Sequence, residues 1–225
     1  MKLKRFFSFS GTWRKGQSLV ELTLVLTLLL TLLTGMVEFA NLLNQYVTLT
    51  DAAREGVRFG SNDDPFIRDT TPFIVNEAFF FKMDEIVEGS FVGHDYTALV
   101  RNPNSKGALS PLKLRPALGD DVVISFFSID GATLKRFPTG SDNGWSYYHR
   151  KDPSAFAGRI SAFSTSQLAN RLIVDAPPTG FVLVEIYYSY DQLIKLWSFI
   201  GAPDPIPVHT YSIMPLSAAE PTPGP

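Results

Sequence analysis

An uncharged, leucine-rich run at residues 22–37 constrains this chain more than any other feature, and Glu21 and Glu38 bracket it. Such a run is too long for a buried strand, so it predicts a helix. As a helix it would rise roughly 24 Å, whereas the hydrocarbon core of a bilayer is about 30 Å thick. A helix that extends from Leu19 to Leu43 would exceed this thickness and place Glu38 toward one membrane face. We therefore expect a single transmembrane helix.

The basic residues are concentrated at the N-terminus, and the remainder of the chain is acidic. The first 16 residues carry no acidic side chain and these basic ones: Lys2, Lys4, Arg5, Arg14 and Lys15. The whole chain has 20 basic and 22 acidic residues, so the part after residue 16 has a net charge of −7. A basic end on an acidic body argues against nucleic-acid binding. By the positive-inside tendency, the basic end stays cytoplasmic and residues from about 44 onward lie outside the inner membrane.

Three interpretations fit a basic end followed by an apolar run: a cleaved secretory signal, a plain signal anchor, and a prepilin-type segment that is cut before the run. A secretory signal needs small residues after the run, and Thr34-Gly35-Met36 is a poor cleavage site. A plain anchor has no use for a carboxylate such as Glu21, because an acid costs on the order of 2.5 kcal/mol or more at the centre of a span. The residues favour the prepilin-type segment.

This interpretation predicts a leader of residues 1–16 that is cut between Gly16 and Gln17. In the stretch Arg14–Glu21, a glycine follows a basic pair and a glutamate stands five places after that glycine. Cleavage would expose the amine of Gln17, which could pair with Glu21 of a neighbouring subunit, offset the desolvation of its carboxylate and fix the axial stagger. The simpler alternatives are that Glu21 is a helix N-terminal acid favoured by the macrodipole, and that Gly16 is a linker residue.

These residues resemble the TadE-like proteins, the minor pilins or pseudopilins of the tight-adherence (Flp-type) pilus system. The resemblance rests on four linked elements: Gly16–Glu21, the leucine-rich span, Val37-Glu38-Phe39 and Ala52–Arg58. Residues 61–175 carry no motif that we can assign. The resemblance implies a structural or assembly subunit, not an enzyme, in which Glu21 and Glu38 pair subunits. Glu38 has the alternative of marking the boundary between membrane and water.

The implied partners are other pilins or pseudopilins of the same system, a prepilin peptidase, an inner-membrane assembly platform and membrane lipid, with no nucleic acid. The implied location is the inner membrane, crossed once, with the N-terminus cytoplasmic and the C-terminal domain extracytoplasmic. After processing, such a subunit could become associated with the pilus.

Helical periodicity continues beyond the apolar run, so residues 17–60 are expected to form one long helix. Tyr46, Leu49, Ala53 and Val57 recur at steps of three and four, which places them on one face. On other faces, Asp51 can pair with Arg54 and Glu55 with Arg58 at spacing i, i+3. Helix packing is predicted for Ala52, Ala53, Arg54, Glu55, Gly56 and Arg58. The small residues among them would pack either against this chain's own sheet or against neighbouring subunits.

The remainder, residues 61–216, is expected to form an extracytoplasmic α+β domain, and residues 217–225 a flexible tail. A helix is predicted over 73–87, beginning at Thr71-Pro72, and strands over 90–100, 121–129, 132–138, 181–190 and 208–214. Residues 166–174 fit a short helix or a strand, and 191–200 a helix or an apolar loop. No regular helical crossovers separate the strands, so an antiparallel sheet packed against the long helix is the expected fold.

No cofactor, metal or catalytic residue is predicted. His94, His149 and His209 lie far apart and lack metal spacing, and no serine lies in Gly-x-Ser-x-Gly. The chain has no cysteine, which excludes a disulfide scaffold, a thiolate zinc site and a cysteine nucleophile. Asp142-Asn143-Gly144 resembles part of a calcium loop but is better interpreted as a hairpin turn.

Two further functions compete with a pilin-like role. A permanently membrane-anchored binding or adhesion protein would use its large domain to bind a surface, glycan or partner. Trp145, Tyr147 and Tyr148 could form an exposed adhesive patch there, although packing on the sheet is the default for such aromatics. A membrane-tethered hydrolase would instead need a serine, a histidine and an aspartate clustered in one pocket.

Overall fold

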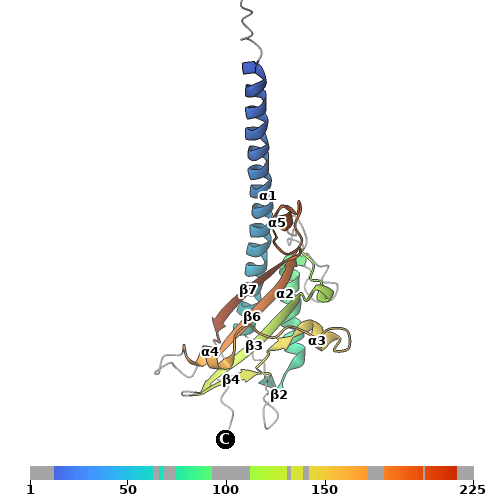
Figure 1. Cartoon of the computed structure of the whole chain (residues 1–225). Helices are drawn as coiled ribbons and strands as arrows, with labels where there is room; N and C mark the ends of the chain where they lie inside the picture. The colour runs from blue at the N-terminus through green and yellow to red at the C-terminus, as the bar shows by residue number, and fades with distance from the viewer. Residues whose placement is uncertain are drawn as a thin grey trace, which may run out of the picture.

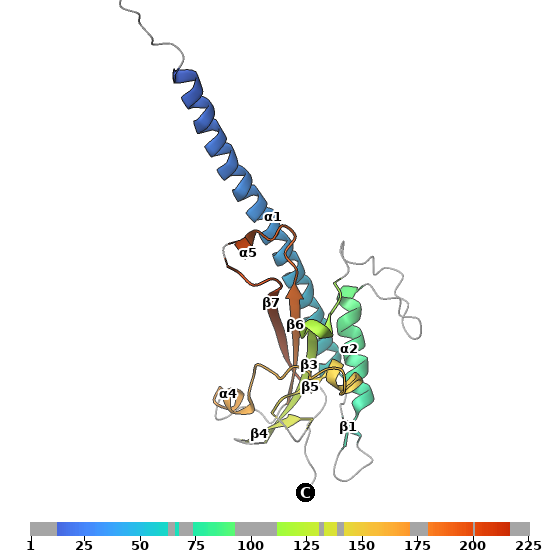
Figure 2. The same cartoon turned by 45° about the vertical axis from the view of Figure 1, so that its right-hand side comes forward.

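One long helix, α1 (Trp13–Asn62), projects from a small α+β domain in the computed structural model (Figure 1). The structure describes residues 13–62, 66–67, 74–92, 112–130, 133–138, 142–171, 180–199 and 201–216. The N-terminal half of α1 stands clear of the domain, and its C-terminal half runs along the sheet (Figures 1 and 2). The predicted single helix through the apolar run and its amphipathic continuation is confirmed.

The domain is built on a five-stranded sheet with the order β4-β3-β6-β7, in which β5 also pairs with β3. The strands are β3 (Asp121–Asp130), β4 (Thr133–Phe137), β5 (Trp145–Ser146), β6 (Phe181–Tyr190) and β7 (Ile206–Pro215). All pairings in it are antiparallel, as predicted. The predicted strands 121–129, 132–138, 181–190 and 208–214 correspond to β3, β4, β6 and β7. The fold class predicted from the sequence is therefore confirmed.

The second helix, α2 (Glu77–Val92), differs from its prediction at both ends. It was expected to begin at Thr71-Pro72, but Ile74 and Val75 form β2, which pairs with β1 (Phe66–Ile67). The helix begins after Asn76, whose side-chain oxygen accepts a hydrogen bond of 3.1 Å from the amide of Ala78. Such a cap satisfies an amide that would otherwise lack a partner in the first turn.

The predicted strand 90–100 is wrong at its start, because residues 90–92 form the last turn of α2. The hydroxyl of Ser90 donates a hydrogen bond of 2.8 Å to the carbonyl of Ile86, one helical turn earlier. The rest of that predicted strand lies outside the described residues, as do the tail from residue 217 and His94.

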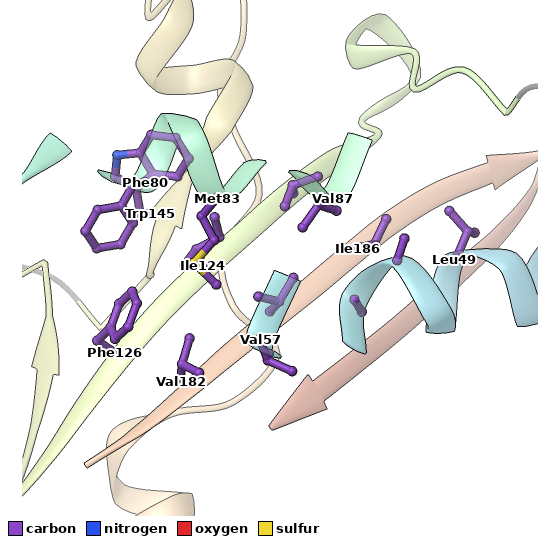
Figure 3. Close-up of a cluster of buried hydrophobic side chains, with 14 of the residues drawn as sticks. Leu49, Val57, Phe80, Met83, Val87, Ile124, Phe126, Trp145, Val182 and Ile186 are labelled. Carbon is purple, nitrogen blue, oxygen red and sulfur yellow. The ribbon is translucent and has the colours of Figure 1, made fainter. Parts of the chain in front are cut away.

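The main core lies between the sheet and the two helices α1 and α2 (Figure 3). Strand alternation explains which residues of β6 contribute, because Val182, Val184 and Ile186 point to the same face. Gly56 marks the closest approach of α1. A Cβ atom built there would lie 2.4 Å from Cγ2 of Val87 on α2 and 3.6 Å from Cγ2 of Val184. Only a residue without a side chain lets the three elements meet so closely.

A smaller core lies on the opposite face of the sheet, beneath α4 (Thr165–Ala169) (Figure 2). It consists of Phe127, Ile129, Leu134, Leu168 and Leu183. The helix α4 accounts for the beginning of the ambiguous segment 166–174. The remaining short elements are the 3-10 helix η1 (Pro116–Leu118), α3 (Tyr147–Lys151) and α5 (Leu196–Phe199). The described part of the ambiguous segment 191–200, residues 191–199, is thus a loop that carries the short helix α5.

Candidate functional site

The N-terminal part of α1, residues 16–37, is an apolar stem that no described part of the chain covers. Its side chains are exposed, apart from partial cover at Thr34 and Gly35, and α1 is long and apolar enough to cross a membrane. The large apolar side chains that it exposes are Leu19, Val20, Leu22, Leu24, Val25, Leu26, Leu28, Leu29, Leu30, Leu32, Leu33, Met36 and Val37. A continuous apolar surface of this size requires lipid or another chain to cover it.

The threonine side chains of the stem suit an apolar environment, because the helix itself satisfies their hydroxyls. The hydroxyls of Thr23, Thr27, Thr31 and Thr34 each donate to the carbonyl one turn earlier, at 2.8 to 2.9 Å. In a bilayer such hydroxyls would otherwise lack partners, since no water reaches the hydrocarbon core. At its threonines, the surface that the stem exposes to lipid or to a neighbouring helix therefore has no unsatisfied hydroxyl donor.

Gly16, Gln17 and Glu21 all lie at the N-terminal end of this stem. The helix begins at Trp13, so the predicted cleavage point between Gly16 and Gln17 falls within its first turn. Glu21 is exposed, and no basic side chain pairs with it in the part of the chain that the structure describes. Its pairing with a neighbouring subunit stays a prediction.

Glu38 is fully buried, and from Gly16 onward it is the first buried residue of α1. Its carboxylate accepts hydrogen bonds from the hydroxyl of Tyr190 at 2.7 Å and from the amides of Leu193 and Ile194 at 2.9 Å each. The hydroxyl of Tyr190 in turn accepts a bond of 3.0 Å from the side-chain amide of Asn41. Burial, followed by the bond to Glu38, raises the pKa of Tyr190 to about 12.

We call this set of residues (Glu38, Asn41, Tyr190, Leu193 and Ile194) the junction. It binds the end of β6 and the loop after it to the base of the stem. Sequence reasoning expected Glu38 to pair subunits or to mark the membrane boundary, and it missed these partners within the chain. No sequence signal connects Glu38 with Tyr190, because 152 positions separate them. The pairing of Glu38 with a neighbouring subunit stays a prediction.

The predicted helix-packing residues separate into an inner and an outer group. Ala52, Ala53 and Gly56 are buried against the chain's own sheet and α2, as is Val57. The charged members are on the outer side, where Arg54 pairs with Asp51 at 3.0 Å and Arg58 with Glu55 at 2.5 Å. Both predicted ion pairs thus form, although exposed pairs of this kind contribute little to stability. Tyr46, expected on the apolar face, is exposed.

A polar cluster on the sheet brings together a serine, a glutamate and a histidine. The fully buried carboxylate of Glu185 accepts hydrogen bonds from the hydroxyl of Ser161, the amide of Ala162 and the hydroxyl of Tyr187, and lies 3.2 Å from Nε2 of His209. Ser161 and His209 both contact the carboxylate. In a catalytic triad the imidazole lies between the hydroxyl and the acid, which is a different order. The hydrogen bonds of this cluster hold residues 160–163 against strand β6 of the sheet.

A second buried cluster contains Asp121 at the start of β3, Asp84 on α2 and Ser146 on β5. Asp121 accepts hydrogen bonds from the hydroxyl of Ser146 at 2.6 Å and from the amide of Arg159 at 2.8 Å, and burial raises its pKa. Burial raises the pKa of Asp84 well above its usual range, and the charges of Glu88 and Asp121 add to the effect. Within the described ranges, no group of three or more acidic or histidine side chains is placed to hold a metal ion.

The aromatic stretch that could have formed an adhesive patch packs into the domain. Trp145 is buried and its ring lies 5.3 Å from that of Phe80 and 5.0 Å from that of Phe81. Tyr147 and Tyr148 are half-buried, and the hydroxyl of Tyr148 donates to Glu88 at 2.7 Å. These aromatic residues therefore pack within the domain, as the default interpretation predicted, and do not form an exposed adhesive patch.

Comparison with protein families gives one match: residues 16–58 match the family model described as TadE-like protein. The matched segment begins at the predicted cleavage glycine, contains the whole stem and Glu38, and ends with the helix-packing residues. It confirms the resemblance found in the sequence over this segment. Comparison with the curated proteins and with the solved structures gives no match.

Proposed function

We propose that this chain is a minor pilin or pseudopilin of a tight-adherence pilus system, a structural or assembly subunit that packs through its N-terminal helix. The observation that carries the proposal is an uncovered apolar surface within the segment that matches the family. The TadE-like match covers residues 16–58, and within it the stem exposes an apolar surface that the chain does not cover. A subunit that moves from a bilayer into a filament needs such a surface, since lipid covers it first and neighbouring stems cover it later.

Processing is the second part of the proposal. A prepilin peptidase would cut between Gly16 and Gln17, and the inner-membrane assembly platform would then receive a chain that begins at Gln17. The charge distribution supports a cytoplasmic leader and an extracytoplasmic domain, because the basic residues of the first 16 positions precede the stem directly. The exposed position of Glu21 supports its pairing with the new amine of a neighbour, since an unpaired carboxylate in the bilayer is costly.

The decisive experiment is intact-mass analysis of the protein purified from its native host, together with pilus assays of a Glu21→Ala variant. We expect a mature chain beginning at Gln17, and we expect the variant to insert in the membrane without entering pili. Thr27→Ala is the matched control, because Thr27 is also on the stem but bonds only to its own helix. A chain that still carries its leader, or normal pili in the Glu21 variant, would contradict the proposal and favour a permanently anchored binding protein.

A further inference from the structure

The loop between β6 and β7 lies at the stem end of the sheet, next to α1. Its described residues are 191–199 and 201–205, and it carries the short helix α5. Figures 1 and 2 both show α5 beside α1, above the strands and close to where the stem leaves the domain. In both views this loop lies nearer to the free stem than the rest of the domain does.

The junction sets the position of this loop along α1. The amides of Leu193 and Ile194 each donate to the carboxylate of Glu38, so the loop is held level with that residue. Glu38 is also where burial of α1 begins, directly after the uncovered stem. If the stem spans a bilayer, the outer surface of that bilayer must lie close to Glu38, and the loop must lie there as well.

The side chains at the tip of this loop are apolar and exposed. Leu193 and Ile194 are 62% and 50% exposed, although their backbone amides are bound. Lys195 follows in a left-handed conformation with φ of 55°, and its ammonium pairs with Asp204 at 3.0 Å. Trp197 is half-buried beyond it. A cluster of apolar residues, a lysine and a tryptophan is typical of segments at the boundary between lipid and water.

We propose that Leu193 and Ile194 insert into the outer interface of the bilayer that holds the stem, as a second contact between the protein and lipid. The inference rests on the proposed function, because it requires the stem to span a membrane. A domain that is anchored by a single helix can rotate about the axis of that helix. A second membrane contact beside the helix fixes the tilt and the rotation of the domain relative to the bilayer. The loop would thus present the outer face of α1 to neighbouring subunits in one orientation.

Depth-dependent quenching on the full chain tests this inference. The chain has no cysteine, so single-cysteine variants carry one fluorescent label each. The variants are Ile194→Cys at the loop, Leu28→Cys on the stem as a membrane reference, and Ile213→Cys as a matched isoleucine. Ile213 is 43% exposed on β7 and pairs with Leu183, roughly 23 Å along β6 from Tyr190. Each variant is placed in nanodiscs of phosphatidylethanolamine and phosphatidylglycerol, without brominated lipids, with lipids brominated high on their chains to report the interface, or with lipids brominated near the chain ends to report the bilayer centre at position 28.

We expect roughly twofold or stronger quenching at position 194, because interfacial segments lie about 5–10 Å into the headgroup boundary, and none at position 213. Quenching at position 28 but not at 194 would overturn the inference and would be compatible with the proposed function. A neighbouring subunit, and not lipid, would then be what covers the loop. No quenching at 28 would overturn both. Near-UV circular dichroism checks that each variant keeps its fold, and Leu193→Cys repeats the measurement at the adjacent residue.

Discussion

The hydroxyl of Tyr190, the last residue of β6, donates a hydrogen bond of 2.7 Å to the buried carboxylate of Glu38 on α1. This bond joins the sheet to the long helix at the point where the helix leaves the domain. Two backbone amides complete the set of donors to the same carboxylate. One acidic side chain thereby determines how the loop after β6 sits against the stem.

Replacing Tyr190 with phenylalanine should destabilise the domain by about 1–3 kcal/mol, because Asn41 and Glu38 each lose a buried partner. Thermal unfolding of the full chain in detergent, followed by near-UV circular dichroism, measures the change. Tyr211→Phe is the control, since Tyr211 is exposed on β7 and should tolerate the change. Equal melting temperatures for the two variants would show that the junction contributes no stability.

Removing the carboxylate of Glu38 should release the loop after β6. In Glu38→Ala the amides of Leu193 and Ile194 lose their acceptor, and bonds to charged groups contribute about 1.5–3 kcal/mol each. Trypsin should therefore cut after the exposed Lys195 roughly tenfold faster or more, since cleavage follows the population of the open loop. Glu55→Ala, which removes only an exposed ion pair, should leave the cleavage rate unchanged. An unchanged rate in the Glu38 variant would refute this role.

Gly56→Ala should cost about 1–3 kcal/mol through overpacking, because the new Cβ would lie 2.4 Å from Cγ2 of Val87. Val87→Ala removes that methyl group and costs stability of its own by leaving a cavity. In the double variant the two changes should compensate, with a coupling energy of about 1 kcal/mol. Denaturant unfolding of the four proteins gives the cycle. Strictly additive losses would mean that α1 and α2 can separate without penalty.

Asp84→Asn should stabilise the domain at neutral pH, because it removes an ionisable carboxyl whose charged form is disfavoured by burial. The pKa of Asp84 is raised in the folded state. The stability of the wild-type domain therefore falls as pH rises from the unfolded value of 3.8 through the folded pKa. The gain in stability of the Asn variant over the wild type should grow with pH between these two pKa values and vanish below pH 3.8. Thermal melts across pH measure this, with the exposed Asp51→Asn as control. A pH-independent difference would contradict the assignment.

The regular elements were predictable where the local pattern was strong. The apolar run predicted the stem, and the β-branched and aromatic runs predicted β3 and β6 closely. The start of α2 was missed because Thr71-Pro72 and Asn76 both resemble helix starts. Local sequence does not say which of them the helix uses. The short segments around α4 and α5 were ambiguous because their apolar residues are too few to define a period.

The sequence by itself determined the stem, the amphipathic face of α1 and the antiparallel sheet, because these depend on residues a few positions apart. The cleavage site between Gly16 and Gln17 stays a prediction from the sequence. Only the tertiary structure decided what Glu38 does. Its partners come from a strand end and a loop far along the chain, and they meet it only when β6 lies against α1. The same close packing buried Gly56 and left Leu193 and Ile194 exposed beside the stem. Long-range contacts of this kind follow from how the elements pack, and no local pattern encodes them.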